Sequence, residues 1–180
     1  MVVPPIVSDS NFTNLHFSSA RLTRALSSST MKQQDWHKEL GWLREKLVGN
    51  FYVSFTVSDI WQFYFSGLYL LAHEIVCSAE SDIESMLSGF VADATPVDPE
   101  NVVKAVIVSS HQRKLITNVD MASDCMLTIR FDTGFSISFP TNTSNVDWQW
   151  CFNQTGEWPH SDCKLGCFWS GELEGNIDAG

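Results

Sequence analysis

Two stretches of the chain alternate apolar and polar residues, turn at a glycine, and alternate again. The first is WQFYFSGLYL, residues 61–70, and the second is LTIRFDTGFSISF, residues 127–139. Alternation over five or more residues is typical of a half-buried β-strand, and a glycine turn between two such runs is typical of a hairpin. Each stretch therefore predicts an antiparallel hairpin. The alternating FYVSFTV, residues 51–57, predicts a further strand before the first hairpin, and VVKAVIV, residues 102–108, is also strand-like.

Two other segments predict helices. Near the start, apolar residues recur at i, i+4, i+7 and i+11 and so share one helical face: Trp36, Leu40, Leu43 and Leu47. Gly49 follows at a position typical of a helix stop. Further along, Ser81 with Glu84 three residues later forms a capping-box pattern, which predicts a short helix in the middle of the chain.

The two hairpin stretches also resemble each other. Gly67 and Gly134 lie about 67 residues apart, and VSDIWQFYF before the first turn is echoed by ASDCMLTIRF before the second. A unit that cannot bury its apolar face alone is stabilised by packing on a copy of itself. We therefore predict an α+β fold in which two duplicated hairpin units form antiparallel sheets, with one amphipathic N-terminal helix and a short middle helix. Chance similarity between two hairpins is the alternative.

These elements suggest a division of the chain. Residues 1–30 are rich in Ser and Thr without sustained periodicity, so we expect a poorly ordered arm. A helix-plus-hairpin unit then covers 31–90, a linker with two prolines and three acids covers 91–101, and the second hairpin unit covers 102–170. We expect a flexible tail over 171–180.

Charge changes the picture of possible partners. The formal net charge is −10, no Lys or Arg lies between Lys46 and Lys104, and only Lys164 follows Arg130. Such a field repels phosphate backbones, so we expect no direct binding of nucleic acid. It attracts a basic protein and speeds the encounter with it. The alternative is that the acidity only keeps the protein soluble.

The expected compartment is the cytoplasm. No apolar run reaches the roughly 20 residues that cross a bilayer, so we expect no membrane partner. The chain does not open with a basic segment followed by an apolar one, which a secretory signal would require. The oligomeric state is left open by the sequence.

One cluster has the composition of a metal site. The stretch CFNQTGEWPHSDCKLGC contains four soft ligands of the kind that zinc prefers: Cys151, His160, Cys163 and Cys167. Their spacing includes no C-x-x-C pair, however, and Cys151 beside Trp150 is typical of a small apolar core residue. We therefore expect no metal and no cofactor, with a zinc-stabilised interaction domain as the alternative. The chain also lacks a G-x-S-x-G elbow and a glycine-rich phosphate loop, so we expect no enzyme.

Aromatic residues near the C-terminus suggest a contact surface. DWQWCF places Trp148, Trp150 and Phe152 on one face of a predicted strand, and such a face is usually core. Trp158 and Trp169 stand in loop-like sequence and are better candidates for exposure, where large aromatics concentrate binding energy. The residues that we expect to bind a partner are Glu80, Asp82, Asp132, Asp147, Trp148 and Trp158.

Two long stretches, LVGNFYVSFTVSDIWQFYFSG and LTIRFDTGFSISFPTNTSNVDWQW, each combine a strand, a turn, a return strand and an acidic or Trp-bearing close. In this style, over about residues 36–153, the chain resembles the small acidic immunity proteins that protect bacteria from polymorphic or contact-dependent toxins. The resemblance implies stoichiometric binding to a toxin domain, often a basic nuclease, and carries over no functional residue. A small-molecule or nucleotide-binding module is the alternative.

Overall fold

Two antiparallel β-sheets and four helices make up the part of the chain that the structure describes, residues 36–91 and 99–177 of a computed structural model. The helices are α1 (His37–Leu47), α2 (Glu80–Val91), α3 (Pro99–His111) and α4 (Pro159–Asp162). The strands are β1 (Ser54–Val57), β2 (Trp61–Phe65), β3 (Leu68–Ala72), β4 (Val76–Cys77), β5 (Ile116–Met121), β6 (Leu127–Phe131), β7 (Ser136–Phe139), β8 (Trp150–Asn153), β9 (Leu165–Trp169) and β10 (Glu172–Glu174).

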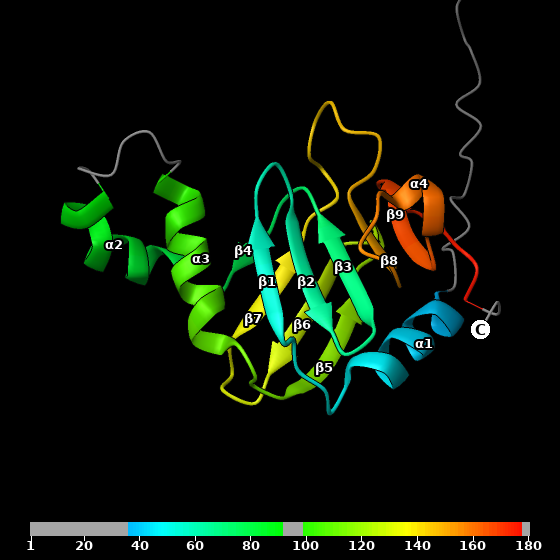
Figure 1. Cartoon of the computed structure of the whole chain (residues 1–180), viewed down its shortest axis with the longest axis horizontal. Coiled ribbons are helices and arrows are strands. Elements are labelled where there is room, and N and C mark those ends of the chain that lie inside the picture. Colours follow the sequence, from blue (N-terminus) through cyan, green and yellow to red (C-terminus); the bar gives the residue numbers. More distant parts are fainter. Residues whose placement is uncertain (1–35, 92–98, 178–180) are drawn as a thin grey trace, which may run out of the picture. The chain divides into compact units, whose positions relative to one another are not determined.

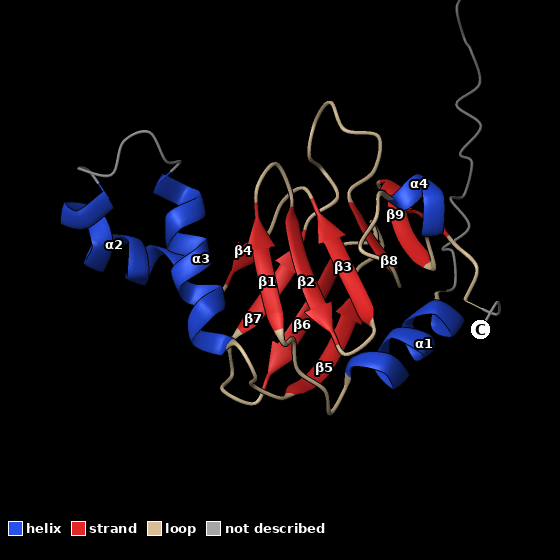
Figure 2. Ribbon diagram, in the orientation of Figure 1, coloured by secondary structure: helices blue, strands red, loops and turns tan. Residues whose placement is uncertain are grey.

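The larger sheet has the strand order β1-β2-β3-β8-β9-β10, and the smaller has the order β4-β7-β6-β5 (Figures 1 and 2). Every neighbouring pair is antiparallel. The predicted α+β class with antiparallel sheets is therefore confirmed. None of the helices within the described residues has the length and apolar content that a membrane span needs.

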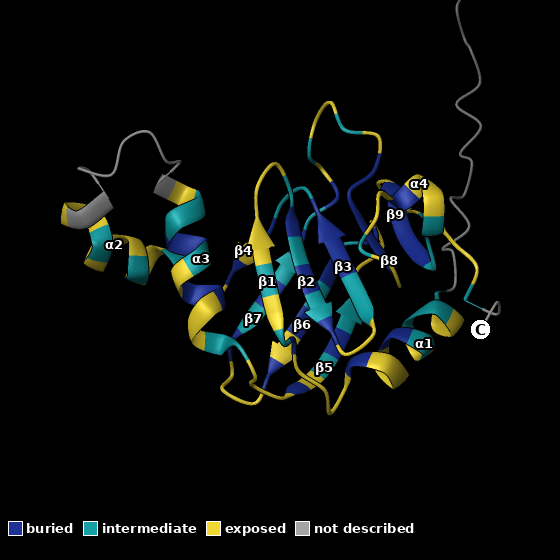
Figure 3. Ribbon diagram, in the orientation of Figure 1, coloured by how far each residue is buried: buried dark blue, intermediate teal, exposed yellow. Residues whose placement is uncertain are grey.

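The alternation in the two hairpins places one face of each sheet in the core, as predicted (Figure 3). Inward residues of β2 and β6 belong to one apolar cluster: Trp61, Phe63, Phe65, Leu127, Ile129 and Phe131. Phe63 meets Phe139 of β7 edge-on, with ring centroids 5.7 Å apart. The two sheets thus share a single core that is rich in aromatic side chains.

Both predicted hairpins are present, as β2–β3 and β6–β7. Each belongs to a three-stranded meander that follows a helix, since α1 precedes β1–β2–β3 and α3 precedes β5–β6–β7. The next strand then joins the opposite sheet, so β4 pairs with β7 and β8 pairs with β3. This correspondence agrees with two related units, whose common origin stays a prediction.

The strand predicted for VVKAVIV is wrong, because these residues lie in α3. Val103, Ile107 and Val108 are buried, which is the i, i+4, i+5 spacing of a helical face. Pro99 opens the helix and Glu100 lies in its first turn, both typical of a helix start. The run of β-branched residues, which is typical of strands, led to the wrong prediction. Neither α3 nor α4 is among the two helices that the sequence predicts.

Several predicted boundaries fall near or beyond the described residues. The arm at 1–30 and most of the linker at 91–101 lie outside them. Pro99 to Asn101 of that linker are helical. Part of the predicted tail, Glu172–Glu174, pairs with β9 as the last strand of the larger sheet.

A buried lysine ties α3 to the segment between β3 and β4. Lys104 is only 2% exposed, and its Nζ lies 2.5 Å from Glu74 Oε1 and 2.6 Å from Glu100 Oε1. Burial alone would lower the pKa of Lys104, but the hydrogen bonds to Glu100 and Glu74 outweigh it and raise the pKa above the ordinary value. The two carboxylates are what make a charged lysine stable at this position.

Replacing both carboxylates (Glu74→Gln with Glu100→Gln) is expected to reverse the pH dependence that Lys104 gives to folding. In the wild type the stabilisation is complete below pH 10.5 and is lost as the pH rises through the higher folded-state pKa. In the double variant only burial acts, so the pKa falls and the protein gains stability as the pH rises from about 7 to about 10. Urea unfolding over this range measures the difference. The two single variants are controls. If the unfolding free energy that the double variant loses at neutral pH equals the sum of the losses in the two single variants, the two carboxylates do not act together on Lys104.

Candidate functional site

The segment around α4 combines an exposed tryptophan with a buried one. Trp158 lies immediately before the helix and is 59% exposed, while Pro159 at the first helical position is buried and fixes the entry of the chain. Trp148 is 1% exposed, and its ring meets that of Trp158 edge-on with centroids 6.0 Å apart. The exposed Trp158 ring therefore packs on a buried aromatic ring, which restricts its movement.

Trp148 belongs to a small apolar cluster separate from the main core. Its buried companions are Leu71, Cys151 and Phe168, and the ring of His73 lies 4.2 Å from its own. Trp150 and Phe152 instead belong to the main core. The prediction that Trp148 shares a face with these two residues is therefore wrong. The reason is that β8 is buried on both sides and Trp148 precedes it, so strand alternation does not extend back to residue 148.

A histidine–aspartate hydrogen bond forms close after the exposed tryptophan in the chain. His160 of α4 donates a hydrogen bond from Nε2 to Asp147 Oδ2 at 3.0 Å, and both side chains are largely exposed. This hydrogen bond holds the pKa of Asp147 below its usual value, so the carboxylate stays ionised. Asp147, which the sequence predicts as a partner contact, is thus bonded to His160, two residues after Trp158 of the same predicted set.

Two further acids, Asp162 and Glu174, line a hollow beside α4. This hollow of about 480 Å³ is lined by His160, Asp162, Cys163, Phe168 and Glu174, among others. The Asp162 carboxylate accepts a hydrogen bond from the backbone N–H of Gln154 at 3.2 Å. We use the name α4 surface for the following five residues: Asp147, Trp158, His160, Asp162 and Glu174.

The other predicted contact residues lie elsewhere. Glu80 and Asp82 are in the first turn of α2, where Glu80 accepts a hydrogen bond from the Cys77 backbone amide. Asp132 is exposed in the turn between β6 and β7. Since α2 packs on α3 whereas α4 packs on β8, these acids are not part of the α4 surface (Figure 1). The structure therefore brings together Asp147, Trp148 and Trp158 from the predicted set.

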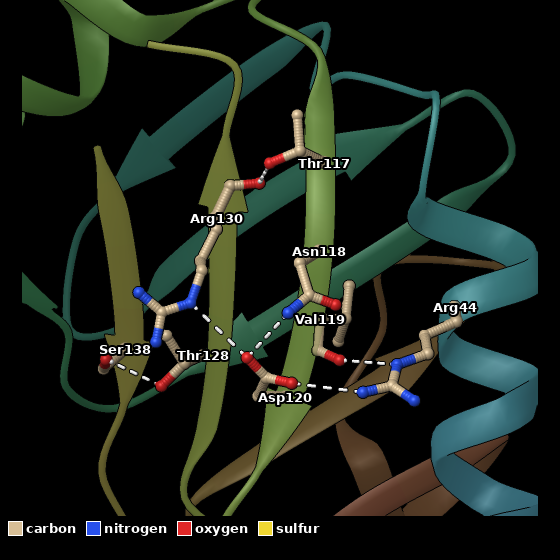
Figure 4. A network of polar contacts seen from close by, with 8 residues as sticks. All are labelled: Arg44, Thr117, Asn118, Val119, Asp120, Thr128, Arg130 and Ser138. Carbon is tan, nitrogen blue, oxygen red and sulfur yellow. Dashed lines mark hydrogen bonds and ion pairs between the residues drawn. The ribbon is translucent and has the colours of Figure 1, made fainter. Parts of the chain in front are cut away.

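A polar network on the outer face of the smaller sheet was not predicted from the sequence (Figure 4). Asp120 of β5 accepts hydrogen bonds from Arg44 of α1 at 3.1 Å, from Arg130 of β6 at 3.4 Å and from Asn118 at 2.8 Å. Arg44 also donates from Nε to the Val119 carbonyl oxygen at 2.9 Å. The network fixes α1 against β5 and gives both arginine side chains the same carboxylate partner.

A basic hollow was also missed. About 320 Å³ in volume, it is lined by Lys46 and Lys164 together with the aromatic Trp42 and Phe65, and the amides of Asn50 and Gln154 also face it. Lys46 lies in the last turn of α1 and Lys164 immediately precedes β9, so two cations that are 118 positions apart in the chain line one hollow. No local spacing in the sequence could have indicated this pairing.

The four candidate zinc ligands have different partners. Cys151 Sγ lies 3.4 Å from Cys163 Sγ, His160 bonds Asp147, and Cys167 Sγ lies 3.1 Å from the Trp169 carbonyl oxygen. Within residues 36–91 and 99–177, no three His, Cys, Asp or Glu side chains converge in a way that could hold a metal ion. The cysteines in this part of the chain are all free thiols.

Comparison with known proteins adds no relative. No protein-family model matches the chain, and no curated protein or solved structure matches it either. Its function is therefore inferred from its own residues and their geometry.

The two tryptophans of the α4 surface region are expected to differ in what they contribute to folding. Trp148→Ala removes a fully buried ring and should lower the free energy of unfolding by about 3–5 kcal/mol. Trp158→Ala loses only one edge-to-face contact, with an expected cost of about 0.5–1.5 kcal/mol. Urea unfolding followed by circular dichroism measures both. Equal losses would show that Trp158 is a core residue and remove it as a contact residue.

Proposed function

We propose that this chain is a non-catalytic binding protein that neutralises a cognate toxin by stoichiometric binding, as immunity proteins do. The observation that carries the proposal is Trp158, an indole that is more than half exposed yet packed on the buried Trp148, with the ionised Asp147 bonded to His160 two residues further along the chain. Aromatic anchors of this kind dominate the energy of protein interfaces, and a rigid one loses little conformational entropy on binding.

The charge of the chain supports a basic partner. With a formal net charge of −10, its field accelerates the approach of a cationic surface such as the substrate groove of a nuclease. Asp147 bonds His160 of α4, and Asp162 and Glu174 line the hollow beside α4, so three carboxylates lie in or near this helix. Electrostatic steering would set the rate of association, and burial of Trp158 would set the rate of dissociation.

Co-expression with the products of neighbouring genes tests the proposal. One of these products is expected to arrest growth alone and to be neutralised by this chain in a one-to-one complex. Trp158→Ala should weaken that complex by about thirtyfold or more, because anchor residues cost at least about 2 kcal/mol when truncated. Trp169→Ala is the matched control, since Trp169 is 58% exposed but lies at the end of β9 outside the α4 surface.

Rate measurements separate steering from anchoring. Asp147→Lys should slow association at low salt and leave dissociation nearly unchanged, with the difference vanishing at high salt. Unchanged association at low salt would argue against steering. If Trp158→Ala and Trp169→Ala bind and protect alike, the α4 surface is not the contact region.

A second candidate function is favoured by the basic hollow. Lys46 and Lys164 oppose the overall acidity of the chain, and Trp42 and Phe65 beside them offer apolar ring surface. Two cations next to aromatic side chains suit a small anion with a planar apolar part, such as a nucleoside monophosphate. This alternative is the small-molecule module that the sequence also allows.

The hollow can be probed directly with adenosine monophosphate. Binding is expected to change the fluorescence of Trp42, and adenosine, which lacks the phosphate, should bind at least about tenfold more weakly. Lys46→Gln combined with Lys164→Gln should abolish the difference between the two ligands, whereas Lys114→Gln, in the turn after α3, should preserve it. Equal binding of both ligands by the wild type, or none, would reject this alternative.

A further inference from the structure

The sulfur atoms of Cys151 and Cys163 are in direct contact. Their Sγ atoms are 3.4 Å apart, and both thiols are free. Cys151 is fully buried in β8, whereas Cys163 follows α4 and is half-buried. A disulfide bond is about 2.0 Å long, so a modest rotation of the Cys163 side chain brings the two sulfurs within bonding distance.

A glycine makes this approach possible. Gly166 of β9 is the register partner of Cys151. A Cβ atom at Gly166 would lie 3.1 Å from Cys163 Sγ and 3.2 Å from Cys151 Cβ. Both distances are tighter than ordinary contacts, so the absence of a side chain at position 166 leaves the space in which the two cysteines meet.

The two thiols have different chemical roles available to them. Cys151 donates its S–H to Cys163, which lowers the pKa of Cys163 and raises that of Cys151, where burial acts in the same direction. Burial and the nearby Asp162 and Glu174 carboxylates oppose the shift at Cys163 without cancelling it. Cys163 also lines the 480 Å³ hollow beside α4, so a small reagent can reach it. Cys163 thus meets the requirements of an attacking thiolate and Cys151 those of a resolving thiol.

We propose that Cys163 and Cys151 form a peroxide-responsive dithiol site that closes to an intramolecular disulfide. The Cys163 thiolate attacks one oxygen of hydrogen peroxide, the O–O bond breaks, and the hydroxide that leaves takes up a proton to become water. The Cys151 sulfur then attacks the Cys163 sulfenic acid, the S–O bond breaks, and a second water leaves with the Cys151 proton. Two thiols are oxidised by two electrons in total, and one peroxide is reduced to two waters.

The disulfide would close a loop that contains the centre of the α4 surface. Trp158 and His160 both lie between Cys151 and Cys163. A bond across the ends of this segment restricts its freedom and fixes α4 against β8. Oxidation would therefore tune partner binding through Trp158, a consequence that rests on the proposed function, whereas the disulfide itself does not.

A second cysteine pair provides an internal control. The thiols of Cys125 and Cys167 also influence each other, since the pKa of Cys125 is lowered and that of Cys167 raised by their interaction, but both residues are fully buried. If thiol proximity alone determined oxidation, both pairs would react. Because the proposal requires an accessible attacking sulfur, only the Cys151–Cys163 pair should react with peroxide while the protein is folded.

The experiment treats the reduced full-length chain with hydrogen peroxide and follows its intact mass and its free thiols. The expected product has lost two hydrogens, contains a Cys151–Cys163 cross-linked peptide, and returns to the starting mass with dithiothreitol. Cys163→Ser should abolish this product, and Cys167→Ser should leave its formation rate within about a factor of two. Cys151→Ser should instead accumulate the sulfenic acid at Cys163, which a dimedone label detects.

Each alternative result has a defined meaning. A cross-link between Cys125 and Cys167, or stepwise addition of oxygen to Cys163 in the wild type at the rate seen for Cys151→Ser, would overturn the proposal. Circular dichroism of Cys163→Ser guards against loss of fold, and Cys163→Ala gives a second variant at this half-buried position. Partner affinity measured before and after oxidation reports separately on the proposed function, because the cross-link is identified without any partner present.

Discussion

Phe63 of β2 packs edge-on against Phe139 of β7, and this contact joins the inner, apolar faces of the two sheets. The exchange of β4 and β8 between the sheets strengthens the joint, because each half of the chain completes its sheet with a strand from the other half. Residues 47–50 and 116 also pair directly, through Gly49 N to Ile116 O and Ile116 N to Asn50 O, both at 2.8 Å. Neither half can bury its aromatic face alone.

The α4 surface is a consequence of that exchange. Since β8 enters the larger sheet beside β3, its second face must be covered, and Trp148, Cys151 and Phe168 form the small cluster that covers it. The chain then passes through Trp158 and α4 before returning as β9, so the exposed indole rests on the cluster instead of on a free loop. A strand exchange required for stability thereby fixes the position of the residue that we propose as an anchor.

Sequence patterns predicted what depends on local spacing. The hairpins and the exposure of Trp158 and Trp169 follow from alternation and from loop-like composition, and the structure agrees with them. The patterns failed where distant residues decide the outcome. In VVKAVIV the β-branched residues outweighed helical spacing, and the salt bridge from Lys104 to Glu74 that α3 makes is invisible before folding. The Asp120 network and the basic hollow likewise join residues far apart in sequence.

The same long-range effects change the interpretation of the charge. A net charge of −10 suggests one broad acidic face, but Asp120 bonds two arginines, and Glu80 accepts a hydrogen bond from the Cys77 backbone amide of β4. What remains around α4 is a smaller acidic area whose neighbour is cationic, because Lys164 lines both the acidic hollow and the basic one. A partner that covers the α4 surface would therefore meet a lysine at its border, and an anion bound in the basic hollow would reduce the local positive charge there. Binding at the two places would then be coupled, with the anion favouring a basic partner and the partner in turn favouring the anion.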